Sequence, residues 1–214
     1  MNPAAAEMME QLIHRGIRDP RVLDAMAGIP RENFVPENVR DTVYSDQPLP
    51  IGYGQTITQP YMTALMAELL ELRGSEKVLD VGTGSGYHAA VLGKLARRVV
   101  SIERIPELCV MARANLAQAE NITVLCGDGS LGVPEEAPFD AISVAAASPH
   151  TPPALIDQLA DPGILVIPVG SRDQQDLRVV RKQNGTITTR LASGCRFVPL
   201  VGSQGWPEDR REKD

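Results

Sequence analysis

Between residues 60 and 170 the sequence alternates between short runs rich in Val, Ile and Leu and longer runs in which apolar residues recur at helical spacing. The strand-like runs cover residues 76–82, 97–103, 121–129, 139–147 and 163–170. The helical runs cover residues 60–73, 85–96, 106–119 and 152–160. Apolar strands without polar alternation are typical of parallel sheets that helices cover on both faces. The alternation therefore predicts an α/β fold, a Rossmann-like doubly wound and mostly parallel sheet.

The two flanking regions read differently. Residues 4–16 and 19–30 resemble two short helices, the second with Asp19 as N-cap and Pro20 at its first position, and an irregular segment follows at 31–54. After residue 170, two strand-like runs surround Asn184-Gly185, a strong hairpin signal, and residues 195–201 read as a further strand. An antiparallel edge should therefore close the sheet.

We expect a single domain over residues 1–214. Its parts are the N-terminal helices and substrate-side loop (1–59), the cofactor-binding core (60–170), the hairpin and edge strand (171–206) and a charged tail (207–214).

Charge and composition argue against several function classes. The net charge is -6 and no long basic run occurs, which argues against nucleic acid and anionic membranes as partners. The three cysteines lack C-x-x-C spacing, which predicts free thiols in a reducing compartment, and the three histidines are too scattered to predict a metal site. No signal peptide or membrane span is visible, so we expect a soluble, cytoplasmic protein, with a monomer as the default.

A glycine-rich turn at residues 78–87, VLDVGTGSGY, carries the first functional signal. A dinucleotide fingerprint would read G-x-G-x-x-G, whereas this turn reads G-x-G-x-G and is followed by Tyr87. Asp80 precedes the first glycine, Glu103 ends the next strand, and Asp128 ends the one after it. Carboxylates at strand ends suit a cofactor with a cationic centre, ribose hydroxyls and an adenine amino group. The pattern predicts an S-adenosylmethionine site that includes Asp80, Gly82, Thr83, Gly84, Gly86, Glu103 and Asp128.

A second signal precedes this turn. Residues 52–60, GYGQTITQP, are uncharged and rich in hydroxyl groups. Taken in order, GQTITQPYM, VLDVGTGSGY, VVSIER, GDG, APFDAI, ALIDQL, GILVIPVG and RFVPLVG resemble the protein-L-isoaspartate O-methyltransferase family over nearly the whole chain. The glycine turn is shared by many methyltransferases, whereas the hydroxyl-rich stretch combined with RFVPLV is specific to this family.

The resemblance implies a repair reaction. S-adenosylmethionine methylates the free α-carboxyl of L-isoaspartyl residues in aged proteins, and to a lesser extent the β-carboxyl of D-aspartyl residues, after which the ester collapses to a succinimide. It also implies that Arg104 and Gly129 bind the cofactor and that Gln55, Thr56, Ile57, Thr58, Val198, Pro199 and Leu200 bind the substrate. Thr58 takes the active-site position, where the family usually has serine.

Other interpretations stay open at this point. Thr56 and Thr58 are also suited to cap the helix that begins near Pro60, and residues 195–201 also suit an ordinary edge strand. Three other functions compete with this interpretation. They are a methyltransferase of the same fold acting on a small molecule or nucleic acid, an NAD-dependent oxidoreductase, and a non-catalytic nucleoside-binding module. Asn184 before Gly185 also predicts a deamidation site, which would make the aged enzyme its own substrate.

Overall fold

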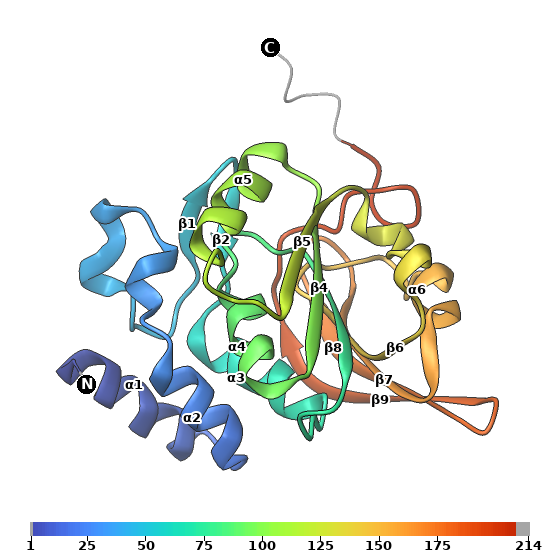
Figure 1. Cartoon of the computed structure of the whole chain (residues 1–214), viewed down its shortest axis with the longest axis horizontal. Coiled ribbons are helices and arrows are strands. Elements are labelled where there is room, and N and C mark those ends of the chain that lie inside the picture. The colour runs from blue at the N-terminus through green and yellow to red at the C-terminus, as the bar shows by residue number, and fades with distance from the viewer. Residues whose placement is uncertain (1, 209–214) are drawn as a thin grey trace.

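The computed structural model describes residues 2–208, so most of the predicted tail at 207–214 lies outside the described residues. Its centre is a seven-stranded sheet with strand order β5-β4-β3-β6-β7-β8-β9. The strands are β3 (Lys77–Val81), β4 (Arg98–Glu103), β5 (Ile122–Cys126), β6 (Phe139–Val144), β7 (Leu159–Gly170), β8 (Gln175–Gln183) and β9 (Thr186–Cys195). The first five are parallel, and β8 and β9 run antiparallel to their neighbours. The predicted fold class is confirmed (Figure 1).

Helices cover both faces of this sheet. They are α3 (Pro60–Leu69), α4 (Tyr87–Leu95), α5 (Pro106–Asn115) and α6 (Pro153–Asp157), with short 3-10 turns η3 (Gly129–Leu131) and η4 (Pro134–Glu136) between β5 and β6. Neighbouring residues of β3 show the two-sided burial, because Val78 belongs to the hydrophobic cluster under α3 and α4 whereas Leu79 belongs to the cluster under α6. Both side chains are fully buried, as the unbroken apolar runs of the sequence predict.

The N-terminal region packs beside α3 and α4 (Figure 1). It contains α1 (Pro3–His14), α2 (Pro20–Gly28), and two 3-10 turns, η1 (Arg31–Phe34) and η2 (Glu37–Thr42). Asp19 caps α2 as predicted, since its side chain accepts from the Arg21 backbone nitrogen.

The prediction of an irregular segment up to residue 54 is wrong at its end. Strands β1 (Leu49–Gly52) and β2 (Gln55–Ile57) form a separate two-stranded antiparallel sheet. Leu49, Ile51 and Ile57 are buried and hold this hairpin against the core, but Pro50 and the shortness of the strands hide the alternation in the sequence.

The C-terminal hairpin is confirmed, with Asn184 and Gly185 both at positive φ (52° and 72°) in its turn. The further strand expected at residues 195–201 is wrong. Cys195 still belongs to β9, and the rest of this segment makes only isolated bridges, with Leu200 N donating to Ala147 O at 2.7 Å. Residues 198–200 are thereby held beside the end of β6.

Two of the three cysteines also depart from the prediction of free thiols. Cys109 on α5 and Cys126 at the end of β5 form a disulfide, because the helix packs on the strand and brings the two Cα atoms to 6.0 Å; Cys195 is free. Within residues 2–208, no group of three or more His, Cys, Asp or Glu side chains is arranged to hold a metal ion. No described helix is long and apolar enough to cross a membrane.

Candidate active site

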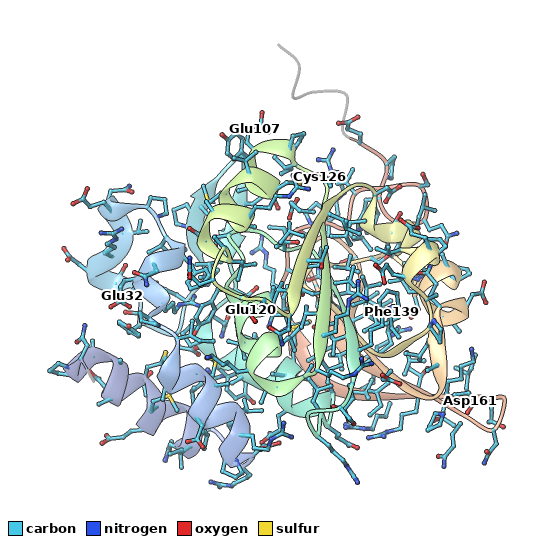
Figure 2. All side chains as sticks on the ribbon, viewed as in Figure 1. Glu32, Glu107, Glu120, Cys126, Phe139 and Asp161 are labelled. Atoms are coloured by element: carbon cyan, nitrogen blue, oxygen red, sulfur yellow. A yellow bond between two sulfur atoms is a disulfide. The ribbon has the colours of Figure 1, made fainter. Side chains whose placement is uncertain are left out.

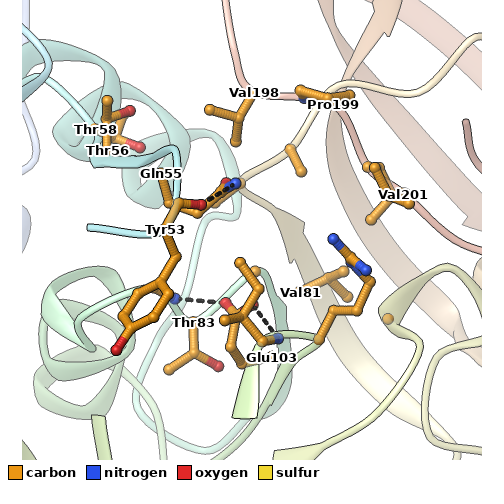
Figure 3. Close-up of a pocket in the computed structure, with 18 of the residues that line it drawn as sticks. Tyr53, Gln55, Thr56, Thr58, Val81, Thr83, Glu103, Val198, Pro199 and Val201 are labelled. Carbon is orange, nitrogen blue, oxygen red and sulfur yellow. Dashed lines mark hydrogen bonds between the residues drawn. The ribbon is translucent and has the colours of Figure 1, made fainter. Parts of the chain in front are cut away.

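A cavity of about 240 Å³ lies at the carboxyl ends of β3, β4 and β6. One wall is formed by the β1–β2 hairpin, the residues that follow it and the segment from Val198 to Val201, and the turn after β3 and Glu103 lie across from the residues that follow the hairpin (Figure 3). The predicted site residues that line it are Gln55, Thr56, Ile57, Thr58, Gly82, Thr83, Gly84, Glu103, Arg104, Gly129, Val198, Pro199 and Leu200. The fold therefore brings together residues from three distant parts of the sequence.

The glycine turn between β3 and α4 forms one wall of this cavity. Gly82 (φ 92°) and Gly84 (φ 56°) have backbone conformations that disfavour residues with a Cβ. A Cβ on Gly84 would also approach Ile51 Cδ1 to 3.2 Å, so the β1–β2 hairpin sits directly on the turn. Glycine is needed here both for the turn and for this close contact.

Glu103 is the most strongly positioned carboxylate of the cavity. One oxygen accepts from Gly84 N at 2.9 Å and the other from Ile105 N at 3.0 Å (Figure 3). Each carboxylate oxygen has two acceptor sites, so one site on each oxygen stays available to a ligand. A pair of hydroxyl groups could be bound in this way.

The stretch from Gln55 to Thr58, which we call the lip, faces the glycine turn across the cavity. Thr58 does not cap the following helix, since Gln59 is the N-cap residue of α3 and its side chain makes no capping bond. The carboxylate of Asp46 takes over part of that task by accepting from Tyr61 N at 2.9 Å. The alternative of Thr58 as helix cap is therefore wrong.

The comparisons with known proteins agree over nearly the whole chain. The profile of the family "Protein-L-isoaspartate(D-aspartate) O-methyltransferase (PCMT)" matches residues 3–205. A protein-L-isoaspartate O-methyltransferase of Methanoculleus marisnigri is 54% identical over 203 residues, covering 94% of this chain and 92% of the relative. The chain belongs to this family.

Solved structures of the protein-L-isoaspartate O-methyltransferase family have the same fold. One of that name is 29% identical with a TM-score of 0.85, covering 94% of this chain and 67% of the other. A second, from Plasmodium falciparum and in complex with S-adenosyl-L-homocysteine, is also 29% identical with a TM-score of 0.78 and covers 91% and 97% of the two chains. The family resemblance expected from the sequence motifs is confirmed.

Asp80, although predicted as a cofactor ligand, lies beneath the glycine turn and does not line the cavity. Its Oδ2 accepts from Ser101 Oγ at 2.7 Å, and the Thr83 hydroxyl lies 2.6 Å from the same Ser101 oxygen. Its Oδ1 has no hydrogen-bond partner among residues 2–208. Burial raises the pKa of Asp80 to about 7, and the charge of Glu103 adds to the shift.

His88 continues this buried polar row on the cavity side. Its Nε2 lies 2.8 Å from Ser143 Oγ, and Ser143 is the register partner of Asp80 in the sheet. Burial lowers the pKa of His88 to about 4, so the imidazole is neutral at pH 7. Hydrogen bonds between neighbouring polar side chains therefore compensate for their burial at the centre of the sheet.

Asp128 and Gly86 also lie outside the cavity lining. Asp128 caps η3 by accepting from Ser130 N, and Ser203 N donates to its other oxygen at 2.7 Å. Burial raises the pKa of Asp128, but the hydrogen bonds from Ser130 and Ser203 outweigh burial, and the pKa is lowered. In the described structure its oxygens bind the chain itself, and its contact with adenine stays a prediction.

Several lining residues were missed by sequence reasoning. They are Tyr53, Gly54, Thr63, Val81, Ser85, Tyr87, His88, Ile102, Ile105, Ala145, Ala146, Arg172, Val201, Pro207 and Glu208. Ser85, Tyr87 and His88 fall within or directly after the glycine turn, so the sequence could have predicted that they line the cavity. Arg172 and Glu208 reach the cavity from the β7–β8 turn and from beyond β9, and no local pattern marks them.

Proposed function

We propose that this cavity carries out the reaction of its family: a methyl group passes from S-adenosylmethionine to the free α-carboxyl of L-isoaspartyl residues and, less readily, to the β-carboxyl of D-aspartyl residues. The observation that carries the proposal is a neutral, hydroxyl-bearing lip facing the glycine turn and Glu103 across one cavity. As a member of the family, the chain is an S-adenosylmethionine-dependent protein carboxyl methyltransferase.

The described residues fit this cofactor. Glu103 keeps one acceptor site on each oxygen, which suits the two ribose hydroxyls. Ser85 lines the cavity with a buried hydroxyl that has no hydrogen-bond partner among the described residues, so a polar ligand atom is expected beside it. Gly82, Thr83 and Gly84 would hold the cofactor from below, and Arg104 and Gly129 from the adjacent strand ends.

The chemistry requires little from the protein beyond positioning. When bound, the cofactor supplies an electrophilic methyl group and retains the electron pair of the broken carbon–sulfur bond. The acceptor α-carboxyl has an ordinary pKa of about 3.5 and is already ionised at pH 7, so no general base is needed. This agrees with a His88 whose Nε2 is engaged by Ser143 and not by a catalytic partner.

The lip then orients the acceptor. The Thr58 hydroxyl and its neighbours Gln55 and Thr56 would hydrogen-bond the substrate carboxylate and backbone, and apolar Ile57, Val198 and Leu200 would exclude water from the carboxylate oxygen that forms the new bond. An uncharged lip leaves this oxygen more nucleophilic than an ion pair would. We assign Thr58 as the catalytic side chain.

The cellular role proposed with this reaction is repair of aged proteins. Action as a single-domain monomer over residues 1–214, in the cytoplasm and without nucleic-acid or membrane partners, stays a prediction from the sequence. The small-molecule alternative is less well supported, because the matching family and the curated relative are named for protein L-isoaspartate as the acceptor.

The test is transfer of labelled methyl from S-adenosylmethionine to two peptides that differ only in carrying L-isoaspartate or normal L-aspartate. Labelling of the isoaspartyl peptide alone, as a base-labile ester, is the expected result. Equal labelling of both peptides would contradict the specificity, and labelling of neither with cofactor binding intact would contradict the acceptor.

A further inference from the structure

Arg31 stands out among the buried residues outside the cavity. It lies in η1, and its side chain is completely buried. Its Nε donates to Val43 O at 2.9 Å and its Nη2 donates to Thr58 O at 2.7 Å. Its guanidinium carbon lies 4.7 Å from the ring centroid of Tyr87, at the start of α4. One side chain therefore connects η1, the end of η2, the lip and α4.

Such burial is costly without a compensating carboxylate. Among residues 2–208 no ion pair joins Arg31 to an acidic side chain, and its Nη1 has no hydrogen-bond partner. Burial lowers the pKa of the guanidinium. A Met or Leu would fill the same space without this cost, so the value of the arginine lies in the two backbone carbonyls that its planar fork connects.

Thr58 has few other restraints. The preceding strand β2 has only three residues, pairs only with β1, and does not join the seven-stranded sheet. After Thr58 the chain is held again, because Asp46 accepts from Gln59 Nε2 at 3.2 Å and from Tyr61 N at 2.9 Å. Thr58 thus lies between a short hairpin and a capped helix, and Arg31 is the side chain that fixes its carbonyl.

We propose that Arg31 is a positioning residue for methyl transfer: its guanidinium fixes the Thr58 backbone and so aims the Thr58 hydroxyl at the acceptor carboxylate. This inference rests on the proposed function and on the role of Thr58 in it. Arg31 itself does not line the cavity. Because a misplacement of about 1 Å can slow catalysis by roughly 100-fold, loss of this tie should be seen mainly in kcat.

Arg21 provides a matched control. It too donates to two backbone carbonyls, those of Leu72 and Leu95. Leu72 lies after the end of α3, Leu95 ends α4, and neither residue lines the cavity. Arg31→Met and Arg21→Met remove the same number of hydrogen bonds to backbone carbonyls. Arg31→Lys serves as the second variant, since it keeps the positive charge but loses the planar fork.

Steady-state methylation of the isoaspartyl peptide gives the kinetic test. We expect Arg31→Met to lower kcat by up to about tenfold, and by no more than Thr58→Ala does, with the Kd for S-adenosylhomocysteine within about twofold of wild type. Arg31→Lys should fall between Arg31→Met and wild type. Arg21→Met should lower the midpoint of urea unfolding but leave kcat unchanged. Equal losses of kcat in Arg31→Met and Arg21→Met would overturn the proposal.

The double variant Arg31→Met/Thr58→Ala tests whether the effect passes through Thr58. If it does, the double variant is no slower than the slower of the two single variants. If the two factors multiply, Arg31 acts by another route and the proposal is wrong.

Hydrogen exchange of residues 55–59 separates this inference from the proposed function, because it requires no activity. Faster exchange in Arg31→Met, with no change in Arg21→Met, shows that Arg31 holds the lip. If Arg31→Met does not fold, Arg31→Lys takes its place in this comparison. Unchanged exchange overturns the proposal. An inactive wild-type enzyme with this exchange pattern would contradict the proposed reaction and not the tie between Arg31 and Thr58.

Discussion

The two walls of the cavity are built in different ways. The glycine turn and Glu103 are held by the backbone of the central sheet, where Gly82 N donates to Ile102 O at 2.9 Å and Gly84 N donates to Glu103. The lip is held by a side chain from the N-terminal region, since Arg31 donates to Thr58 O. Asp46 holds the residues directly after the lip by accepting from Gln59 and Tyr61. The cofactor wall is thus part of the sheet, whereas the substrate wall is attached to it.

This difference teaches where single substitutions should act. A change beneath the glycine turn alters the core of the sheet and should affect stability or cofactor affinity. A change at the lip should affect the rate of methyl transfer and leave the cofactor bound. The following predictions test this separation, from the largest expected effect to the smallest.

The largest effect should come from Asp80→Asn. The pKa of Asp80 is about 7 in the folded protein, against an ordinary value of 3.8 for an aspartate in an unstructured chain. Its contribution to stability is therefore present below pH 4 and lost as the pH rises through 7. The free energy of unfolding of wild type, relative to Asp80→Asn, should fall by on the order of 4 kcal/mol across that window. Urea unfolding of both proteins at a series of pH values measures this difference, and a flat difference would mean that Asp80 remains ionised.

Glu103→Ala should weaken binding of S-adenosylhomocysteine by about 100-fold, because charged hydrogen bonds of roughly 1.5–3 kcal/mol each are lost. Titration calorimetry measures the Kd. Glu107→Ala is the matched control, since this exposed carboxylate lies in the first turn of α5 and outside the cavity (Figure 2). Similar affinities of the two variants would remove Glu103 from the cofactor site.

Thr58→Ala should lower kcat for the isoaspartyl peptide by about tenfold, while the affinity for S-adenosylhomocysteine stays as in wild type. Thr58→Ser keeps the hydroxyl, restores the residue usual in the family, and should keep the activity. An unchanged rate in Thr58→Ala would contradict the assigned role. A loss of cofactor affinity would contradict the separation of the two walls.

The smallest effect is expected at the hairpin turn, which belongs to neither wall. Both Asn184 N and Gly185 N donate to the carboxylate of Asp161, at 2.7 and 2.6 Å (Figure 2). Deamidation requires Gly185 N to attack the Asn184 side chain, so this clamp should slow it. Asp161→Ala should raise deamidation at Asn184 several-fold in aged protein, measured by mass spectrometry, without changing kcat of fresh enzyme. Equal deamidation in both proteins would show that the clamp has no protective effect.

The sequence predicts the elements of the cofactor wall and the residues of the lip, but it does not predict what holds the lip in place, and the reason is physical. Val/Ile/Leu runs define the strands, and the glycine turn is local, so both are visible in short windows. The lip depends on Arg31, and a lone arginine is expected at the surface because burying its charge is costly. Its partner Thr58 is 27 residues away, and no pattern connects the two.

A position near the end of a strand does not by itself show whether a side chain lines the cavity. Asp80 is the second-last residue of β3 and points into a face of the sheet beside Ser101, whereas Glu103 is the last residue of β4 and points beyond it. Both lie at the carboxyl edge and, because Glu103 follows Ser101, the register partner of Asp80, by two residues, both side chains are on the same face of the sheet. Glu103 lies two residues farther along its strand than that partner, and only Glu103 lines the cavity. The disulfide was missed for a related reason, since 17 residues separate Cys109 from Cys126 and only helix-on-strand packing brings them together.

The return of residues 198–201 to the end of β6 has a consequence for how the enzyme is made. The parallel strands and the glycine turn are synthesised first, but the wall formed by Val198 and Leu200 docks on Ala147 only after β8 and β9 are complete. A chain that ends at Cys195 would contain every strand of the seven-stranded sheet and still lack one side of its active site. Activity should therefore arise only after residues 198–201 have been synthesised and have closed the cavity.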